Sequence, residues 1–330
     1  MDGITTILPV HLRNPDAADA NSLDRAIDSV LSQDTRSLPH ELLVIDDGSD
    51  PPIANLPAGC RIIRLRRNRG LSYALNAGLS QASHNLIARI DADDAWRPGK
   101  LARQLAMFAA DPALTLVASS MRLHHKNPGL GRDELRGGDW AHTLALTTRI
   151  GCPFPHGSIL ARCDVFEQIG GYPQNARFDH AEDFALWAQW IRFFKVAIAN
   201  EVFLDYTVSD SQISTRFATE QQKASHSAAA ALNALGENRG SIPQAVESLA
   251  AGLNLDLLQA SKILFTAWRF STHILTDPTL YDAAATLFPD RAVHRCSEIY
   301  SLLGGRFYWL SRSPTPQIGL SLGAMVRQPT

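Results

Sequence analysis

Short apolar runs alternate with segments of helical spacing through the first third of the chain. The apolar runs predict β-strands at 4–10, 41–45, 61–65, 85–90 and 114–119. Between them, apolar residues recur every three or four positions and predict helices at 22–33, 72–82 and 98–110, the first capped by Asn21 or Ser22. Strands that alternate with helices in this way indicate an α/β fold built on a mainly parallel sheet.

The pattern changes at about residue 218. Strand-like runs end there, alanine is dense at 228–231, and helical spacing continues to about residue 303. No repeat of fixed period appears in either half. We therefore expect two regions, an α/β domain at 1–217 and a helical C-terminal region at 218–330.

Composition and charge narrow the class of protein. Of the 330 residues 45% are apolar, and 31 Lys and Arg against 33 Asp and Glu leave a formal net charge of −2. This balance argues against a disordered chain and against a nucleic-acid partner. The four cysteines form no Cys-x-x-Cys pair, so neither a zinc ribbon nor a disulfide scaffold is indicated. With no basic leader and no apolar run of about 18 residues, we expect a cytoplasmic protein.

Acidic clusters follow two of the predicted strands. Asp46-Asp47-Gly48-Ser49-Asp50 ends the second strand, and Asp91-Ala92-Asp93-Asp94 ends the fourth. Ligands of open α/β sheets bind beyond the carboxyl ends of the strands, so both clusters are expected to face one crevice. In an extended segment Asp91 and Asp93 lie on one side, which suits a hard divalent cation. A solvated turn is the alternative for either cluster alone, and their tandem occurrence favours function.

The chain contains, in order, ELLVIDDGSD, NRGLSYALNAGL, LIARIDADDAWRPGKL, PFPHGSILARCDVFEQIGGY and AEDFALWAQW. Together these segments resemble the inverting nucleotide-sugar glycosyltransferases of family 2, and the likeness covers roughly residues 4–215. The resemblance implies the GT-A fold, an α/β fold with a mixed, mainly parallel sheet flanked by helices, here followed by the helical C-terminal region.

The resemblance also implies a nucleotide site, in which Asp47 contacts the base and Asp91 lies near the ribose. Arg69 has the planar guanidinium that suits a phosphate. The expected nucleotide-binding residues are Pro9, Val10, Asp46, Asp47, Asn68, Arg69, Gly70, Asn76, Asp91 and Ala92. Asp93, together with Asp91, would hold Mn²⁺ or Mg²⁺ on the diphosphate, and Asp94 is a second candidate. The cation would neutralise the charge that develops on the leaving nucleotide.

By the same likeness Asp183 is the general base, and Glu182 beside it orients the acceptor. A sugar hydroxyl has a very high pKa, so a positioned carboxylate must remove its proton as it attacks the anomeric carbon. A helix N-terminus that favours acidic residues is the alternative explanation for this pair. His156, Gly157, Ser158 and Trp187 are weaker acceptor candidates, for which a structural histidine and core packing remain alternatives.

The chain departs from the family pattern at several places. Gln189 stands where many relatives carry arginine. The segment Tyr206-Thr207-Val208-Ser209 lacks the histidine that in relatives can complete the metal site or touch the diphosphate. Asp210 or Gln212 is a candidate to replace it. The Gln-x-x-Arg-Trp motif of processive synthases is missing, so we expect transfer of one sugar per encounter. The aromatic and basic segment 306–312 suits either a membrane interface or packing of the C-terminal helices.

The leading hypothesis is thus a metal-dependent, inverting, non-processive glycosyltransferase. Its expected partners are a nucleoside-diphosphate sugar, with UDP favoured, and a hydroxyl of a glycan or lipid-linked acceptor, as in surface polysaccharide synthesis. An inactive nucleotide-sugar-binding or scaffold protein is the alternative. A sugar nucleotidyltransferase is disfavoured because no glycine-rich loop follows the first strand, and a dehydrogenase because G-x-G-x-x-G is absent there. Peripheral contact with the inner face of a membrane and a homo-oligomer remain open.

Overall fold

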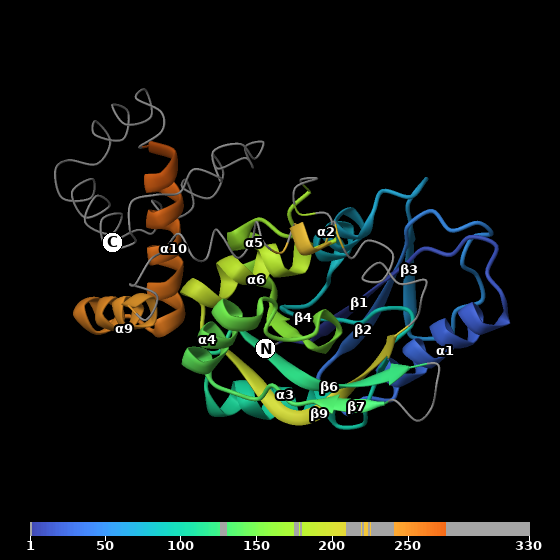
Figure 1. Cartoon of the computed structure of the whole chain (residues 1–330), viewed down its shortest axis with the longest axis horizontal. Coiled ribbons are helices and arrows are strands. Elements are labelled where there is room, and N and C mark those ends of the chain that lie inside the picture. Colours follow the sequence, from blue (N-terminus) through green and yellow to red (C-terminus); the bar gives the residue numbers. More distant parts are fainter. Residues whose placement is uncertain are drawn as a thin grey trace. The chain divides into compact units, whose positions relative to one another are not determined.

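The computed structural model describes residues 2–125, 131–174, 178, 180–208, 219, 221–223, 225 and 241–274. The chain divides into two compact units, Met1–Phe265 and Thr266–Thr330. The first unit contains the sheet and all of the site described below (Figure 1). None of the helices in the described ranges is long and apolar enough to cross a membrane.

Within the described residues, nine strands form one mixed sheet. They are β1 (Ile4–Val10), β2 (His40–Asp46), β3 (Cys60–Arg64), β4 (Leu86–Arg89), β5 (Ala95–Trp96), β6 (Leu116–His125), β7 (Arg132–Glu134), β8 (Leu160–Arg162) and β9 (Val196–Val208). Their order is β3-β2-β1-β4-β8-β6-β9-β5, and β7 pairs with β6. Strands β3, β2, β1 and β4 are parallel, whereas β8 runs antiparallel to both β4 and β6. This mixed α/β arrangement confirms the GT-A architecture expected from the sequence.

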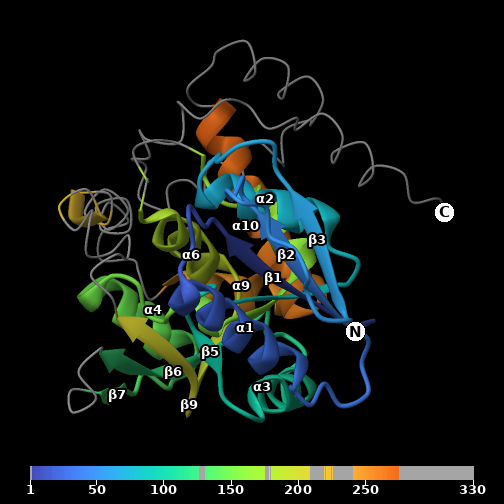
Figure 2. The same ribbon diagram turned by 90° about the vertical axis from the view of Figure 1, so that its right-hand side faces the viewer.

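Helices cover both faces of the sheet. They are α1 (Ala17–Leu31), α2 (Leu71–Gln81), α3 (Lys100–Ala110), α4 (Trp140–Ile150), the short 3₁₀ helix η2 (His156–Ser158), α5 (Cys163–Ile169), α6 (Glu182–Phe193), α9 (Ser241–Leu253) and α10 (Leu257–Ile274). Figures 1 and 2 show α2, α5 and α6 on one face and α1 and α3 on the other. Because both faces are covered, the central strands carry the near-continuous apolar runs that the sequence displays.

The start of α1 differs from the prediction. Its N-cap is Asp16, not Asn21 or Ser22: the Asp16 carboxylate accepts from the backbone N–H groups of Ala18 and Asp19. The Asp19 side chain in turn accepts from the Asp16 N–H, which completes a capping box. The apolar period begins only at Leu23, so the hydrophobic pattern conceals the first turn of the helix.

The C-terminal part of the first unit packs on α6. Helix α9 contacts α6, and Phe265 of α10 makes ring contacts with Phe193 and Phe194. Lys262 of α10 forms an ion pair with Asp164 of α5, with 2.6 Å between Nζ and Oδ2. The unit that holds the sheet therefore runs past residue 217, where the sequence predicts the change to a helical region.

The parallel strands bring the two acidic clusters to one edge of the sheet. Val10 is paired with Asp46, and Ile7 with Arg89, so β1, β2 and β4 all end on the same side. The N–H of Asp47 donates to the carbonyl of Val10 (2.8 Å), which holds the loop after β2 against the end of β1. This edge carries the candidate site.

Gly78, in the interior of α2, allows the helix to lie close to β1. A Cβ at this position would lie 2.6 Å from Cγ2 of Ile7. We expect Gly78→Ala to lower the free energy of unfolding by about 1–3 kcal/mol in urea denaturation, because the helix is forced off the strand. Gly252→Ala in α9, where no described atom lies within 4 Å, is the matched control and should gain up to about 1 kcal/mol. A gain at both positions would contradict the close packing.

Candidate active site

A buried arginine ends β4 and organises the acidic edge. Arg89, only 2% exposed, forms a two-pronged ion pair with the carboxylate of Asp91. Burial alone would lower the pKa of Arg89, but Asp91 and Tyr172 raise it above its ordinary value. The guanidinium therefore stays charged within the protein, and Asp91 is directed toward it.

Asp94 closes the turn that begins at Asp91. Its N–H donates to the Asp91 carbonyl (3.3 Å), and its Oδ1 accepts from the N–H of Thr207 on β9 (2.9 Å). Its Oδ2 is buried and has no hydrogen-bond partner among the described residues. Burial, followed by repulsion from Asp91 and Asp93, raises the pKa of Asp94 well above its ordinary value. Three carboxylates thus occupy one turn at the end of β4.

The second carboxylate pair lies in the first turn of α6. Glu182 is 7% exposed, and burial followed by the charge of Asp183 raises its pKa to about 8. Burial also raises the pKa of Asp183, although its Oδ1 accepts a hydrogen bond from the N–H of Phe184 (2.6 Å). Arg89 and Asp91 influence both pKa values, so the structure brings the two sequence motifs into one electrostatic site.

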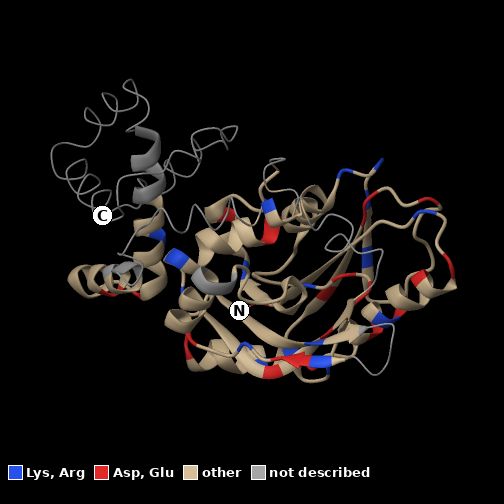
Figure 3. Cartoon of the chain, in the orientation of Figure 1, with Lys and Arg blue, Asp and Glu red and all other residues tan. Residues whose placement is uncertain are grey.

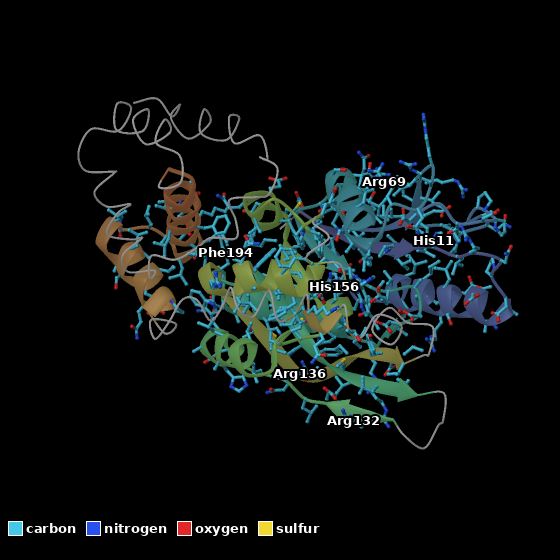
Figure 4. The ribbon with its side chains drawn as sticks, turned by 45° about the horizontal axis from the view of Figure 1, so that its top comes forward. His11, Arg69, Arg132, Arg136, His156 and Phe194 are labelled. Carbon is cyan, nitrogen blue, oxygen red and sulfur yellow. The ribbon has the colours of Figure 1, made fainter. Side chains whose placement is uncertain are left out.

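Neutral polar groups surround the Asp183 carboxylate. Its Oδ2 lies 4.0 Å from Nδ1 of His156 and 4.0 Å from Sγ of Cys152. Nε2 of His156 is 2.7 Å from the hydroxyl of Tyr172. Burial, followed by the charge of Arg89, lowers the pKa of His156 well below its ordinary value, so the ring is neutral at pH 7. Figure 4 labels His156, whose ring centroid lies 5.7 Å from that of Trp187 on α6.

Asp47, one of the residues predicted to bind the nucleotide, holds the N-x-G turn. Its two carboxylate oxygens accept from the backbone N–H groups of Arg69 (2.8 Å) and Gly70 (2.9 Å). Burial raises the pKa of Asp47 despite these bonds. Asn68 caps the same turn by accepting from the Gly70 N–H (3.1 Å). Gly70 has φ +87°, a conformation that glycine adopts readily, and it precedes the first residue of α2.

Asp46 and Asn76 make structural contacts. Asp46 accepts from the N–H groups of Ser49 and Ile53 and is paired with Arg64 at 2.6 Å. Asn76 binds the backbone of Tyr172 through two hydrogen bonds: its amide donates to the Tyr172 carbonyl and accepts from the Tyr172 N–H, both at 2.8 Å.

The other predicted nucleotide residues lie at the same edge. Pro9 and Val10 are buried at the end of β1, and Ala92 is partly buried against the core. The guanidinium of Arg69 lies over the Tyr73 ring, 4.2 Å from its centroid.

The weaker acceptor candidates are tightly packed. Trp187 is fully buried and makes ring contacts with Phe154, His156, Phe166, Tyr172 and Trp190. An acceptor sugar could stack on this ring only if the aromatic cluster opened, so the structure gives Trp187 a packing role. Ser158 is buried and donates to the Pro155 carbonyl, and the Gly157 carbonyl accepts from Nε1 of Trp96. A side chain on Gly157 would place its Cβ 3.4 Å from Oδ2 of Asp94.

The sequence patterns did not predict that Arg89, Tyr172 and Cys152 lie in the candidate site. Arg89 had a visible signal, because it is a lone cation inside the apolar run LIARI. Tyr172 and Cys152 carry no such signal, and only folding brings them to Asp183.

The metal prediction stays untested. Across the described residues, no group of three or more His, Cys, Asp or Glu is arranged to hold a metal ion. Asp210 and Gln212, the predicted substitutes for the third ligand, and the segment 306–312 lie outside the described residues.

The two carboxylate motifs, joined at one edge of a GT-A sheet, define the class of a nucleotide-sugar transferase fold. Residues 5–170, about half of the chain, match the model of "Glycosyl transferase family 2". The chain belongs to this family.

Two curated relatives carry the word glycosyltransferase in their names. The chain is 32% identical over 128 residues to the amylovoran biosynthesis glycosyltransferase AmsE of Erwinia amylovora. The matched region covers 38% of this chain and 46% of AmsE. It is 28% identical over 203 residues to EpsE of Bacillus subtilis, named a glycosyltransferase, over 59% of this chain and 68% of EpsE. The chain thus spans less than half the length of AmsE. The crystal structure of TarS from S. aureus is similar with a TM-score of 0.47 and 15% identity, over 91% of this chain and 49% of that chain.

The raised pKa of Glu182 makes stability depend on pH. Between an unfolded pKa near 4.5 and the folded value of about 8, the folded state keeps a proton that the unfolded state loses. The contribution of Glu182 to stability is therefore fully present below pH 4.5 and is lost as pH rises through this window. Glu182→Gln cannot lose a proton, so from pH 5.5 to 7.5 its free energy of unfolding should rise relative to wild type by up to about 3 kcal/mol. Urea unfolding at several pH values measures this difference. Glu167→Gln, at an exposed position on α5, is the control, and its free energy of unfolding should change with pH as that of wild type does. If the curve of Glu182→Gln also ran parallel to that of wild type, the raised pKa of Glu182 would be contradicted.

Proposed function

We propose that the protein transfers one sugar per encounter from a nucleoside-diphosphate sugar, with UDP favoured, to a hydroxyl of a glycan or lipid-linked acceptor. The reaction inverts the anomeric centre. The observation that supports this most directly is the convergence of Glu182 and Asp183 with the Arg89–Asp91 pair at the carboxyl edge of the sheet. A donor bound at that edge would lie between a nucleotide-binding loop and a buried carboxylate base.

The biological setting is part of this proposal. AmsE is named for amylovoran biosynthesis, and by analogy the present chain acts in the synthesis of a surface polysaccharide. A lipid-linked acceptor would place the enzyme in the cytoplasm at the inner face of a membrane. Family 2 membership supports a nucleotide-sugar donor and a glycan acceptor, but not their identities.

Asp183 serves as the general base in this scheme. Its carboxylate accepts the proton of the acceptor hydroxyl while the hydroxyl oxygen attacks the anomeric carbon and the nucleoside diphosphate leaves from the opposite face. Burial raises the pKa of Asp183, which makes the carboxylate a stronger base once it is ionised. The neighbouring His156 is neutral, so it does not quench the negative charge of the base by forming an ion pair.

The acidic turn fits a divalent cation that shares its coordination with substrate. Asp91 is already paired with Arg89, whereas Asp94 holds one buried carboxylate oxygen without a partner among the described residues. Hard cations prefer such oxygen ligands, and Mg²⁺ commonly combines one or two carboxylates with substrate phosphates. Asp93 and Asp91 would hold the cation, with Asp94 as a further donor. When bound, the cation neutralises charge on the diphosphate leaving group.

Asp183→Asn tests the base. It should lower kcat by about 10²-fold or more, because the amide cannot accept the proton, while nucleotide affinity stays within about twofold of wild type. Activity of the wild type should rise with pH from 6 to about 8 as Glu182, whose pKa is raised to about 8, ionises beside the base. Asp133→Asn on β7, an exposed carboxylate in an ion pair with Arg122, is the control and should keep full activity. An equal loss of nucleotide binding and turnover in Asp183→Asn would contradict its role as base.

Calorimetric titration tests the nucleotide and the metal. UDP, GDP and dTDP are each titrated with Mn²⁺ and with EDTA, and we expect UDP to bind only with the cation. Asp93→Asn should weaken the Mn²⁺-dependent binding by about 10-fold or more, because it removes a charged ligand. Asp111→Asn, a half-buried carboxylate paired with Lys195, provides the control. Failure of all three nucleotides to bind would favour the scaffold alternative.

A further inference from the structure

One face of α1 holds the segment that follows the acidic turn. Arg25 and Ser29 lie one turn apart on the same side of α1, and Gln33 follows the C-cap of the helix. All three side chains form hydrogen bonds with the backbone between residues 93 and 101. The Arg25 guanidinium donates to the Asp93 carbonyl (2.6 Å), and Ser29 Oγ accepts from the Trp96 N–H (3.0 Å). The Gln33 amide donates to the Arg97 carbonyl (3.1 Å) and accepts from the Leu101 N–H (3.3 Å). The position of the acidic turn therefore depends on α1.

Arg25 is the member of this series that reaches the turn itself. Its Nη2 donates to the carbonyl of Asp93 and to Oγ1 of Thr207 (3.0 Å). The Thr207 hydroxyl donates to the same Asp93 carbonyl (2.5 Å), and the Thr207 N–H donates to Asp94 Oδ1 (2.9 Å). The three bonds among Arg25, Thr207 and Asp93 form a closed triangle, and the fourth extends it to Asp94.

This triangle fixes the peptide plane between Asp93 and Asp94. A carbonyl that accepts two hydrogen bonds from different directions has little freedom to rotate, so the directions of both flanking carboxylates are set with it. The triangle also holds Thr207, the penultimate residue of β9, against the turn. Arg25 is exposed, so its hydrogen bonds contribute little to the stability of the core.

We propose that Arg25 is a positioning residue for the donor site, acting through the Asp93 carbonyl and Thr207. This inference rests on the proposed function, in which Asp93 holds the cation on the diphosphate. Arg25 itself touches neither the cation nor the sugar. Its loss should impair binding of metal and donor more than turnover, because the base at Asp183 lies on a different element.

Arg25→Ala is compared with Arg36→Ala in the full-length chain. Arg36 follows α1 and also donates from its guanidinium to a backbone carbonyl, that of Ala102 (3.1 Å), but it lies away from the acidic turn. Amide hydrogen exchange is measured on peptides spanning 91–98 and 203–208, without any ligand. We expect faster exchange in both peptides for Arg25→Ala and wild-type exchange for Arg36→Ala.

The same variants are titrated with UDP and Mn²⁺, and donor KM and kcat are determined. Arg25→Ala should weaken Mn²⁺-dependent binding and raise donor KM by about 10-fold or more, with a smaller change in kcat. Arg25→Lys, which keeps the charge and a donor, should recover part of the loss. Thr207→Val should act in the same direction, and its effect should not add to that of Arg25→Ala, since both act on one carbonyl.

Unchanged exchange or unchanged binding in Arg25→Ala would overturn the inference. Equal defects in Arg36→Ala would also overturn it, because they would assign the effect to general loss of structure. If the wild-type protein binds no nucleotide, the proposed function fails, and the exchange experiment alone then decides whether Arg25 fixes the turn.

Discussion

The ion pair between Arg89 and Asp91 is the interaction on which the site depends. Four carboxyl groups, those of Asp91, Asp94, Glu182 and Asp183, lie within reach of its charge. Without a buried cation, mutual repulsion and loss of hydration would keep more of them protonated. Arg89 offsets part of that cost, and its place at the end of a fully buried strand keeps its charge directed at the acids. Along the edge formed by β6, β7 and β9, by contrast, charged side chains of opposite sign lie next to one another (Figure 3).

The fold was largely predictable because its signals are local. Apolar runs located β1 and β4, and strand-end carboxylates located the edge where the site forms. The predicted start of α1 was wrong because the capping box at Asp16 precedes the apolar period of the helix, which begins at Leu23. Strand β8 was not predicted: Leu160–Arg162 is only three residues long, and its pairing with β4 and β6 depends on residues far away in the chain.

The acidic residues of the candidate site could be predicted from the sequence, but the groups that hold them in place could not. Asp47, Asp91 and Asp183 stand in motifs with clear spacing, whereas their partners are backbone groups or distant side chains. The sequence does not reveal that Asp47 accepts from the Arg69 and Gly70 amides, or that Trp187 is enclosed by other rings. Such facts follow from packing, and a single sequence contains no pattern that encodes them.

The two bonds between Asn76 and the backbone of Tyr172 join the two sides of the site mechanically. Helix α2 starts at the loop that Asp47 holds, and Tyr172 contacts His156, which lies beside Asp183. A small shift of α2 would therefore be transmitted through Tyr172 and His156 to the surroundings of Asp183. The predicted nucleotide loop and the predicted base are thus linked through the scaffold, so a displacement at one end of this chain of contacts would alter the packing at the other.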